Sequence, residues 1–285
     1  MKRLCAIVFI LFVALSSPIR VSAVSMPYLS VAPPNELVER ARFITDYSKS
    51  TAERKHNILL ASKFIDKTLL CVGEEFSFNH VVGRRTENRG FKSAKIIVNG
   101  EFVDGVGGGV CQVSTTLYNA VILAGLCVLE YHPHSLQVGY VPPSRDAMVN
   151  SSGADLRFVN NTDSPLFLRA QADGNNLVIS VWGRAMRESF SVESAITGKN
   201  AIPQPIITVD DKGEYPDLLD GQKKVLRYAK QGIRSESYLV KRVDGKVVER
   251  IRLRKDSYAS IGEIVVIGKA QPPLGDVEFG ESDIA

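Results

Sequence analysis

The sequence feature that most constrains this 285-residue chain is a run of three glycines followed by a cysteine, Gly107-Gly-Gly-Val-Cys111. Beyond Cys111, apolar residues recur at the three-to-four spacing of a helix face, and no proline or glycine interrupts them before Gly125. The loop is therefore expected to run into a helix that begins close to Cys111 and ends near Gly125. The apolar positions of this helix are Val113, Leu117, Val121 and Ala124.

A cysteine in this position has the environment of a nucleophile. A helix N-terminus offers positive partial charge and unpaired N–H groups, which lower the pKa of a thiol from about 8.5 towards neutrality. Because Gly107, Gly108 and Gly109 lack Cβ atoms, we expect that a substrate backbone can lie against them and that their N–H groups can face an oxyanion. The alternative is a buried cysteine that starts a core helix after a glycine-rich turn.

Polar residues near the cysteine are candidates for binding a substrate. Gln112, Ser114 and Thr115 follow the thiol directly, so we expect them to line the site together with the glycines. Arg85 and Thr86 are further candidates, because a guanidinium offers two parallel N–H donors to a substrate carboxylate. The alternative is that these two residues belong to a solvated charged turn.

A thiolate nucleophile needs a base, and His132 and His134 lie just beyond the predicted helix. A connection that folds back would bring one imidazole beside the helix N-terminus, as a Cys–His pair requires. Asp146, or alternatively Asp155, could orient that imidazole through its second nitrogen. We therefore predict Cys111 as nucleophile, His134 or His132 as base and Asp146 as the orienting group.

Zinc binding is the competing chemistry for these residues. His132 and His134, two positions apart, would project to the same side of a strand, and Cys111 could be a third ligand. No fourth ligand and no paired-cysteine spacing accompany them in the sequence. We therefore predict neither a metal nor another cofactor.

The N-terminal residues have the pattern of a secretory signal peptide. Two basic residues precede an apolar run from Leu4 to Leu15, and Val21-Ser-Ala23 supplies the small residues of a cleavage site. The run is shorter than the roughly 20 residues of a membrane helix, and no later stretch approaches that length. We expect cleavage of residues 1–23, a linker over 24–42, and a protein that is secreted and extracellular, without a membrane anchor.

Charge and cysteine content narrow the class of protein further. Removal of residues 1–23 takes away three basic residues, so that 35 − 3 = 32 basic residues face 31 acidic ones. A nucleic-acid-binding protein normally keeps a larger basic excess, which argues against that function. Three cysteines remain, and an odd number outside the cell indicates a thiol that is kept free. A Cys71–Cys127 disulfide would leave Cys111 free, but the sequence leaves the pairing open.

The patterns up to about residue 183 predict one α+β domain, placed at residues 43–183, in which the cysteine-bearing helix packs on a mainly antiparallel sheet. A further helix is expected over 51–67, and Asn99-Gly100 predicts a hairpin turn between two strands. Strands are expected in short runs within 76–82, 96–98, 102–103, 127–131, 136–141, 155–158, 166–170 and 177–182.

A small all-β C-terminal domain is predicted over 211–270, after a linker at 184–210. Asp244-Gly245 predicts a hairpin turn, and the strand that follows it places Arg250, Arg252 and Arg254 on one face. The acidic residues at 271–285 are expected to be disordered.

Positive charge is concentrated in this C-terminal domain. Residues 223–255 hold twelve basic residues against three acidic ones, so the domain is expected to attract anionic polymers. The alternative is a solvated strand face without a ligand. No cysteine or histidine follows His134, so we expect this domain to supply binding affinity and not chemistry.

At these residues the chain resembles the VanW family of bacterial cell-envelope proteins over about 43–183. The C-terminal residues are similar to the G-five module of wall-associated enzymes. This resemblance implies that the protein is cell-wall associated and that the anionic polymers attracted by the C-terminal domain are wall polymers. The VanW resemblance rests on Phe76-Ser-Phe-Asn79, Gly83-Arg-Arg-Thr86, Gly90-Phe91, the segment from Gly107 to Asn119, His132-Pro-His-Ser135, Asp146-Ala147 and Asp155-Leu-Arg-Phe158.

The resemblance implies an activity on peptidoglycan stem peptides, namely L,D-transpeptidation with Cys111 as nucleophile and His134 as base. The sequence departs from the family at 143–145, Pro-Ser-Arg, where a glycine is common, and at Met148, which leaves the role of Asp146 open. Two other functions remain open. One is a cysteine hydrolase of the same peptides, and the other is a non-catalytic wall-binding protein linked to glycopeptide resistance.

Overall fold

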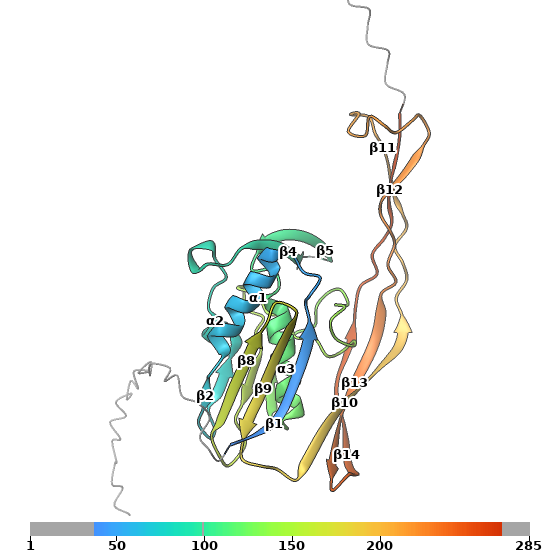
Figure 1. The fold of residues 1–285 in the computed structure, drawn as a ribbon. Coiled ribbons are helices and arrows are strands. Elements are labelled where there is room, and N and C mark those ends of the chain that lie inside the picture. Colours follow the sequence, from blue (N-terminus) through green and yellow to red (C-terminus); the bar gives the residue numbers. More distant parts are fainter. Residues whose placement is uncertain (1–36, 99, 270–285) are drawn as a thin grey trace, which may run out of the picture.

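The computed structural model describes residues 37–98 and 100–269, which form an α+β lobe (residues 38–183) and an elongated all-β arm (residues 188–267) beside it (Figure 1). The expected signal peptide and acidic tail lie outside the described residues. The longest helices of the described chain, α1 and α3, have 14 residues each, too few to span a bilayer.

A four-stranded antiparallel sheet forms one layer of the lobe, in the order β1-β9-β8-β2. Two helices cover one of its faces: α3 packs on β1 and β9, and α1 packs on β8 (Figure 1). This α+β architecture agrees with the fold class that the sequence predicts. The elements are β1 (Val38–Asp46), α1 (Ala52–Ile65), β2 (Leu69–Leu70), α3 (Val110–Leu123), β8 (Leu166–Ala172) and β9 (Asn176–Gly183).

Both predicted helices are confirmed, and their sequences explain where they begin. The Thr51 hydroxyl caps α1 by accepting a hydrogen bond from the Arg54 N–H. In α3 the apolar positions Val113, Leu117 and Val121 are fully buried in the core. Burial of such side chains contributes about 1.5–3 kcal/mol each, so this face of α3 is held by packing against the core.

Short elements complete the lobe around α3. β3 (Glu75–Ser77), β7 (Arg157–Val159) and β6 (Cys127–Glu130) form an antiparallel sheet, and β4 (Ser93–Val98) pairs with β5 (Glu101–Val106) as the predicted hairpin. The hairpin leads directly into the glycine loop. Its turn residue Asn99 lies outside the described residues.

Two predicted strands of the lobe are wrong. Residues Phe78–Val82 form the short helix α2, because Ser77 and Asp155 accept hydrogen bonds from its first N–H groups. Residues 136–141 form a loop: Leu136 and Val138, two positions apart, are both buried as in a strand, but no neighbouring strand pairs with them. The hydrophobic pattern of these residues therefore indicates burial, but they do not form the backbone hydrogen bonds of a β-sheet.

The arm consists of two three-stranded sheets joined end to end (Figure 1). Next to the lobe, β10 (Glu188–Lys199), β13 (Ile233–Val243) and β14 (Lys246–Ser257) are antiparallel. Farther out, β15 (Ile264–Ile267) lies between β11 (Ile206–Val209), which is parallel to it, and β12 (Lys223–Arg227), which is antiparallel. The expected linker at 184–210 thus contains one of the two longest strands, which its mixed composition concealed.

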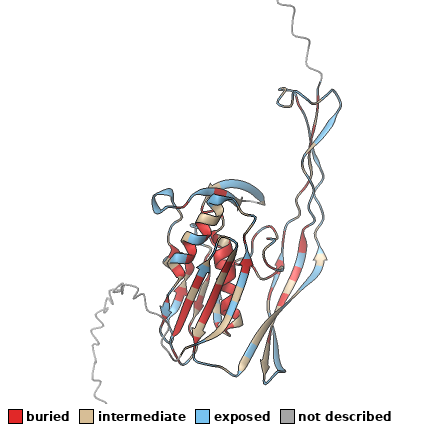
Figure 2. Ribbon diagram, in the orientation of Figure 1, coloured by how far each residue is buried: buried red, intermediate tan, exposed pale blue. Residues whose placement is uncertain are grey.

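The predicted hairpin at Asp244-Gly245 is confirmed, with φ of 49° and 77° at the two turn residues. The predicted arginine face is wrong at one position: Arg250 and Arg252 are exposed, whereas Arg254 is buried. Figure 2 shows buried residues through the lobe and in the part of the arm beside it, and mainly exposed residues farther out along the arm.

Candidate active site

Cys111 is the second residue of α3, at the end of the glycine loop. Gly109 caps the helix in the left-handed region, with φ of 106°, a conformation that an L-residue rarely adopts. The half-buried thiol donates a hydrogen bond of 3.2 Å to the Val149 carbonyl oxygen. The structure therefore places the thiol at a helix N-terminus, in contact with the segment that follows Asp146.

His134 and Asp146 form a buried pair beside this thiol. The His134 backbone N–H and ring Nδ1 both lie 2.7 Å from Asp146 Oδ2. Burial disfavours the imidazolium, but hydrogen bonds to Asp146 and Cys111, together with the charge of both groups, raise the pKa of His134 to about 9. The imidazole is thus held in its protonated form near neutral pH.

His134 also affects the pKa of Cys111. Burial is the largest single influence and disfavours the thiolate, but the hydrogen bond and charge of His134 and the charge of Arg85 outweigh it. Together they hold the pKa of Cys111 below its usual value. An ion pair of thiolate and imidazolium is the species that these shifts favour.

Asp146 is held from its other side by the arm. The Tyr258 hydroxyl donates a 2.5 Å hydrogen bond to Asp146 Oδ1, and Arg254 contacts both the carboxylate, at 3.5 Å, and the backbone carbonyl of the same residue. Burial would raise the pKa of Asp146, but His134, Arg254 and Tyr258 outweigh it and lower that pKa. The arm, which the sequence predicted to supply wall affinity and not chemistry, therefore contacts a residue of the candidate site directly.

Ser114 and Thr115 lie beside Cys111 but do not face a substrate. Both are fully buried, and the Ser114 hydroxyl donates to the Ala147 carbonyl oxygen at 2.5 Å. Thr115 Oγ1 accepts from the Ala147 N–H at 2.9 Å. These hydroxyls therefore fix the segment that carries Asp146, and their predicted role in substrate binding is replaced by a structural one.

The three glycines serve internal packing. A Cβ on Gly108 would lie 2.7 Å from the backbone of Ala94, and one on Gly107 would lie 2.9 Å from the Arg85 side chain. Gly107 and Gly108 are buried, so the space that a substrate backbone was expected to use is filled by the protein itself. This close approach places the start of α3 against β4 and Arg85.

Gln112 also has a structural position. Its buried side chain donates to Thr45 Oγ1 and the Asp46 carbonyl oxygen, and its Oε1 accepts a 2.7 Å hydrogen bond from Arg54 Nη2. Gln112 thereby ties α3 to β1 and holds the Arg54 guanidinium near the N-terminus of α3.

Two arginines present unused donors close to Cys111. Arg54 Nη1 and Arg85 Nη2 are buried atoms without a hydrogen-bond partner. Burial lowers the pKa of both guanidinium groups, and the charge of Cys111 acts against that shift in each case. Arg85 was a candidate from the sequence. Arg54 was not, because it lies on another helix, 57 positions before the cysteine.

Tyr140 is a second residue that the sequence did not single out. Burial, followed by the charge of Cys111, raises its pKa, and its hydroxyl forms a hydrogen bond with Thr115. The phenol therefore stays protonated beside the thiol. It lies in the loop over 136–141, where the incorrect strand prediction hid its proximity to the site.

The remaining candidates lie apart from the Cys111–His134–Asp146 line. His132 Nε2 pairs with Glu130 Oε1 at 2.9 Å, and Asp155 accepts hydrogen bonds from Ser77 and Asn79. Thr86 is exposed at the start of the short 3₁₀ helix η1 (Glu87–Arg89). Within residues 37–98 and 100–269, no group of three or more His, Cys, Asp or Glu side chains is arranged to hold a metal ion.

Cys71, Cys111 and Cys127 are all free thiols in the structure. Cys71 and Cys127 are exposed, whereas Cys111 is partly buried. The Cys71–Cys127 disulfide that the sequence left open is thus not formed here.

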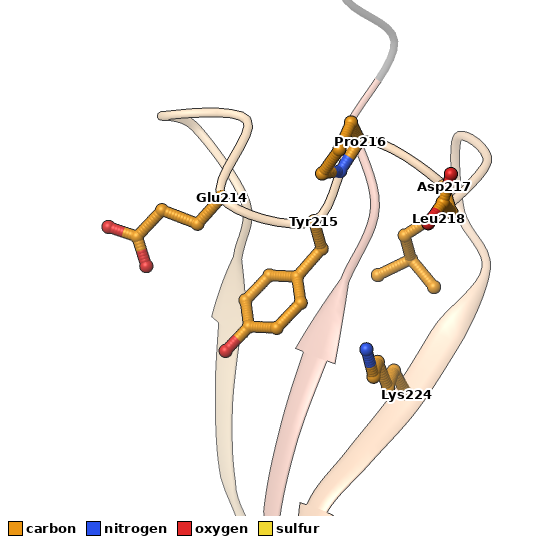
Figure 3. A pocket seen from close by; sticks show the side chains of 6 residues that line it. All are labelled: Glu214, Tyr215, Pro216, Asp217, Leu218 and Lys224. Atoms are coloured by element: carbon orange, nitrogen blue, oxygen red, sulfur yellow. The ribbon is translucent and has the colours of Figure 1, made fainter.

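A pocket at the far end of the arm lies away from these groups (Figures 1 and 3). Figure 3 shows the Lys224 ammonium near the Tyr215 ring, 4.8 Å from its centroid. The lining residues are Glu214, Tyr215, Pro216, Asp217, Leu218 and Lys224. They include no histidine or cysteine.

Comparison with known proteins identifies the two parts of the chain. Residues 53–182 match the family described as VanW like protein, and residues 193–270 match the G5 domain. The chain therefore carries a VanW-like domain followed by a G5 domain, in the order that the sequence resemblance predicted. The G5 match includes residues 193–199 of β10, which explains why the expected linker is structured.

Individual relatives share the VanW-like part. The chain is 48% identical over 141 residues to the uncharacterised protein YoaR of Bacillus subtilis, covering 50% of this chain and 46% of that protein. It is 26% identical over 131 residues to the vancomycin B-type resistance protein VanW of Enterococcus faecalis, covering 44% and 48%. The chain thus spans about half the length of these relatives. Among solved structures, a G5 domain of IgA1 protease is 23% identical, covers 30% of this chain and 92% of its own, and has a TM-score of 0.20.

Proposed function

We propose that this protein is a cysteine L,D-transpeptidase that cross-links peptidoglycan stem peptides. The observation that carries the proposal is the buried line from Cys111 through His134 to Asp146 at the N-terminus of α3. A thiol of lowered pKa, paired with a protonated imidazole that a carboxylate orients, matches the requirements of an acyl-transfer nucleophile. The proposed substrate class comes from the resemblance to the VanW family, to whose model residues 53–182 match.

In the acylation step, the Cys111 thiolate attacks the carbonyl carbon at the L-centre of a donor stem peptide. The carbonyl π electrons move to oxygen, and the Cys111 N–H, in the first turn of α3, is one donor for that oxyanion. When the tetrahedral intermediate collapses, the C–N bond to the leaving D-alanine breaks. The His134 imidazolium gives its proton to the departing amine, which leaves a thioester on Cys111 and a neutral imidazole.

In the transfer step, an amine replaces the Cys111 sulfur at the same carbonyl carbon. A neutral amine from a neighbouring stem peptide attacks the thioester carbonyl carbon, forming the new C–N bond. Its surplus proton passes to His134, and the C–S bond breaks to release the Cys111 thiolate. The enzyme returns to its starting ion pair, so no redox partner or cofactor is required.

Arg54 and Arg85 are the residues that we propose for recognition of the donor. Their unpartnered buried donors lie within electrostatic reach of the thiol, on either side of the glycine loop. A donor stem peptide ends in a carboxylate one residue beyond the bond that is broken. A guanidinium satisfies such a group with two hydrogen bonds, and an unpaired buried donor is costly unless a ligand completes it.

We place the protein outside the cell, in association with the wall, because G5 domains occur in cell-surface proteins. Anionic wall polymers are the proposed partner of the arm. Several basic residues of the arm are already paired, including Arg227 with Glu101, Lys241 with Glu188 and Arg250 with Glu193. Wall attraction is therefore expected to be weaker than the twelve basic residues suggest. Sedimentation with purified walls should fall as the salt concentration rises.

The decisive experiment is mass spectrometry of the protein incubated with a tetrapeptide donor, with and without an excess of acceptor amine. The expected results are a thioester adduct on Cys111 and an amide product when the amine is present. Cys111→Ala should form neither, while the matched variant Cys127→Ala, which removes an exposed thiol, should form both. Free cleaved donor without amide would indicate a hydrolase. Failure of the folded protein to acylate at all would leave the non-catalytic wall-binding function.

A further inference from the structure

We infer that the G5 domain is part of the catalytic unit, because its residues Arg254 and Tyr258 position Asp146 and, through it, the His134 imidazole. This inference deepens the proposed function and rests on it. Neither residue touches the thiol, so both are positioning residues.

The contacts between the arm and Asp146 occupy the carboxylate oxygen that His134 leaves unused. His134 takes Oδ2 with two donors, whereas Tyr258 and Arg254 take Oδ1. All four residues of this cluster, His134, Asp146, Arg254 and Tyr258, are buried. With both oxygens engaged, the carboxylate has one orientation, and Oδ2 stays aimed at Nδ1.

The two arm residues are themselves fixed. Arg254 Nε donates to Asp256 Oδ2 at 2.7 Å, and its guanidinium lies over the ring of Tyr131, 4.5 Å from the centroid. Tyr258 accepts a 2.8 Å hydrogen bond from the Ser144 N–H. Because burial and the charge of Asp146 raise the pKa of Tyr258, its hydroxyl stays protonated and remains a donor.

Further contacts hold the arm in register with this part of the lobe. Ser144 Oγ lies 2.7 Å from Ser235 Oγ, and both residues are fully buried. The Ala259 N–H donates to the Ser135 carbonyl oxygen at 2.8 Å, directly after His134. The arm therefore contacts the chain immediately next to both members of the pair, and a shift of the arm would move His134 and Asp146 together.

The test uses the full-length protein and the variant Tyr258→Phe, which keeps the buried ring and removes the donor to Asp146. Its first readout is the pH profile of Cys111 alkylation by iodoacetamide, which needs no substrate. With one of the two donors to Asp146 Oδ1 removed, the carboxylate and the imidazolium are held less firmly beside the thiolate. The alkylation midpoint should therefore rise by about one pH unit, a tenfold change in the thiolate equilibrium. The second readout is acyl transfer, for which kcat should fall about tenfold while KM stays unchanged.

Arg254→Lys is the second variant. It keeps the positive charge but cannot span Asp146 and Asp256 together, so it should raise the midpoint by a smaller amount than Arg254→Met. The matched control is Tyr238→Phe, which removes a tyrosine hydroxyl bonded to Glu236 at 2.6 Å in the same domain, away from Asp146. It should keep the wild-type midpoint and kcat.

The outcomes separate this inference from the proposed function. If Tyr258→Phe and Arg254→Met keep both the alkylation midpoint and kcat of the wild type, the arm does not position the pair and the inference is overturned. If the wild type transfers no acyl group but its low alkylation midpoint rises in Tyr258→Phe, the proposed function fails and the positioning role stands.

Discussion

The two ends of the arm differ sharply, although they belong to one domain. At the end beside the lobe, Ser235, Arg254 and Tyr258 are buried and bonded to the lobe. At the far end, Leu219 and Tyr228 are 74% and 77% exposed, the strands pair with one another, and Arg227 of β12 forms an exposed ion pair with Glu101 of the lobe. The first end is part of the candidate active site, and the second end is free to meet other molecules.

This difference shows how position decides the role of a charged residue. Arg250 and Arg254 lie on the same strand, four residues apart. Arg250 is exposed, pairs with Glu193 and lies over the Tyr238 ring, so its contribution to stability is small. Arg254 is buried between two carboxylates, where removal of either partner would leave an uncompensated charge. A count of basic residues treats the two alike.

The largest expected effect comes from breaking the buried end at its centre. Asp146→Asn leaves Arg254 without one of its counter-charges and His134 without the carboxylate that orients it. We expect the free energy of unfolding to fall by about 3 kcal/mol or more, and acyl transfer to fall by a factor on the order of 10³ or more. Urea denaturation and steady-state rates measure the two quantities.

The matched control for that change is Asp163→Asn, which removes an exposed carboxylate paired with Arg184 at 2.8 Å. Its effect on stability should stay within about 1 kcal/mol. Equal effects of the two substitutions would contradict the claim that the buried end carries the site.

The stability that the buried end contributes should depend on pH, because His134 titrates there. Because the pKa of His134 in the folded protein is raised above its unfolded value of about 6.5, the stability from this group is fully present below that pH. It is lost as the pH rises through the folded pKa, about 9 in the native protein. The thiol titrates in the opposite sense, so the measurement uses Cys111→Ser, in which Asp146 still raises the His134 pKa.

The stability difference between Cys111→Ser and Cys111→Ser/His134→Gln should therefore be largest near pH 6. It should shrink as the pH rises through the His134 pKa of the Cys111→Ser variant, by about 1.4 kcal/mol for each unit by which that pKa exceeds the unfolded value. A difference that stays constant over this range would show that His134 is not held as an imidazolium.

A smaller effect is expected at the contact between arm and lobe. Ser235→Ala leaves the buried Ser144 hydroxyl without its partner, which should cost about 1–2 kcal/mol in thermal or urea denaturation. Ser237→Ala is an unusually close control, because Ser237 is fully buried on the same strand and its hydroxyl has no hydrogen-bond partner. That variant should be neutral or slightly stabilising. A larger loss of stability from Ser237→Ala than from Ser235→Ala would contradict this prediction.

The smallest effect is expected at the far end. Lys224→Met removes the cation beside the Tyr215 ring, an exposed interaction worth less than about 1 kcal/mol. The rate and pH profile of Cys111 alkylation should stay at wild-type values. A shifted profile would mean that the two ends of the arm are coupled.

The sequence alone determined the features that depend on local pattern. The helix after the glycine loop begins one residue before Cys111, because apolar spacing and glycines act within a few residues of each other. The Asp244-Gly245 hairpin follows from two residues that tolerate positive φ. The VanW-like and G5 domains follow from motifs that are also local.

Tertiary structure alone decided what surrounds the thiol. Arg254 and Tyr258 reach Asp146 across 108 and 112 residues, and Arg54 enters from another helix. Such contacts depend on how sheets and loops pack, which no short-range periodicity records. The same cause explains why Ser114, Thr115, Gly107 and Gly108, close to Cys111 in sequence, are buried in packing contacts: closeness along the chain does not fix which groups face the site.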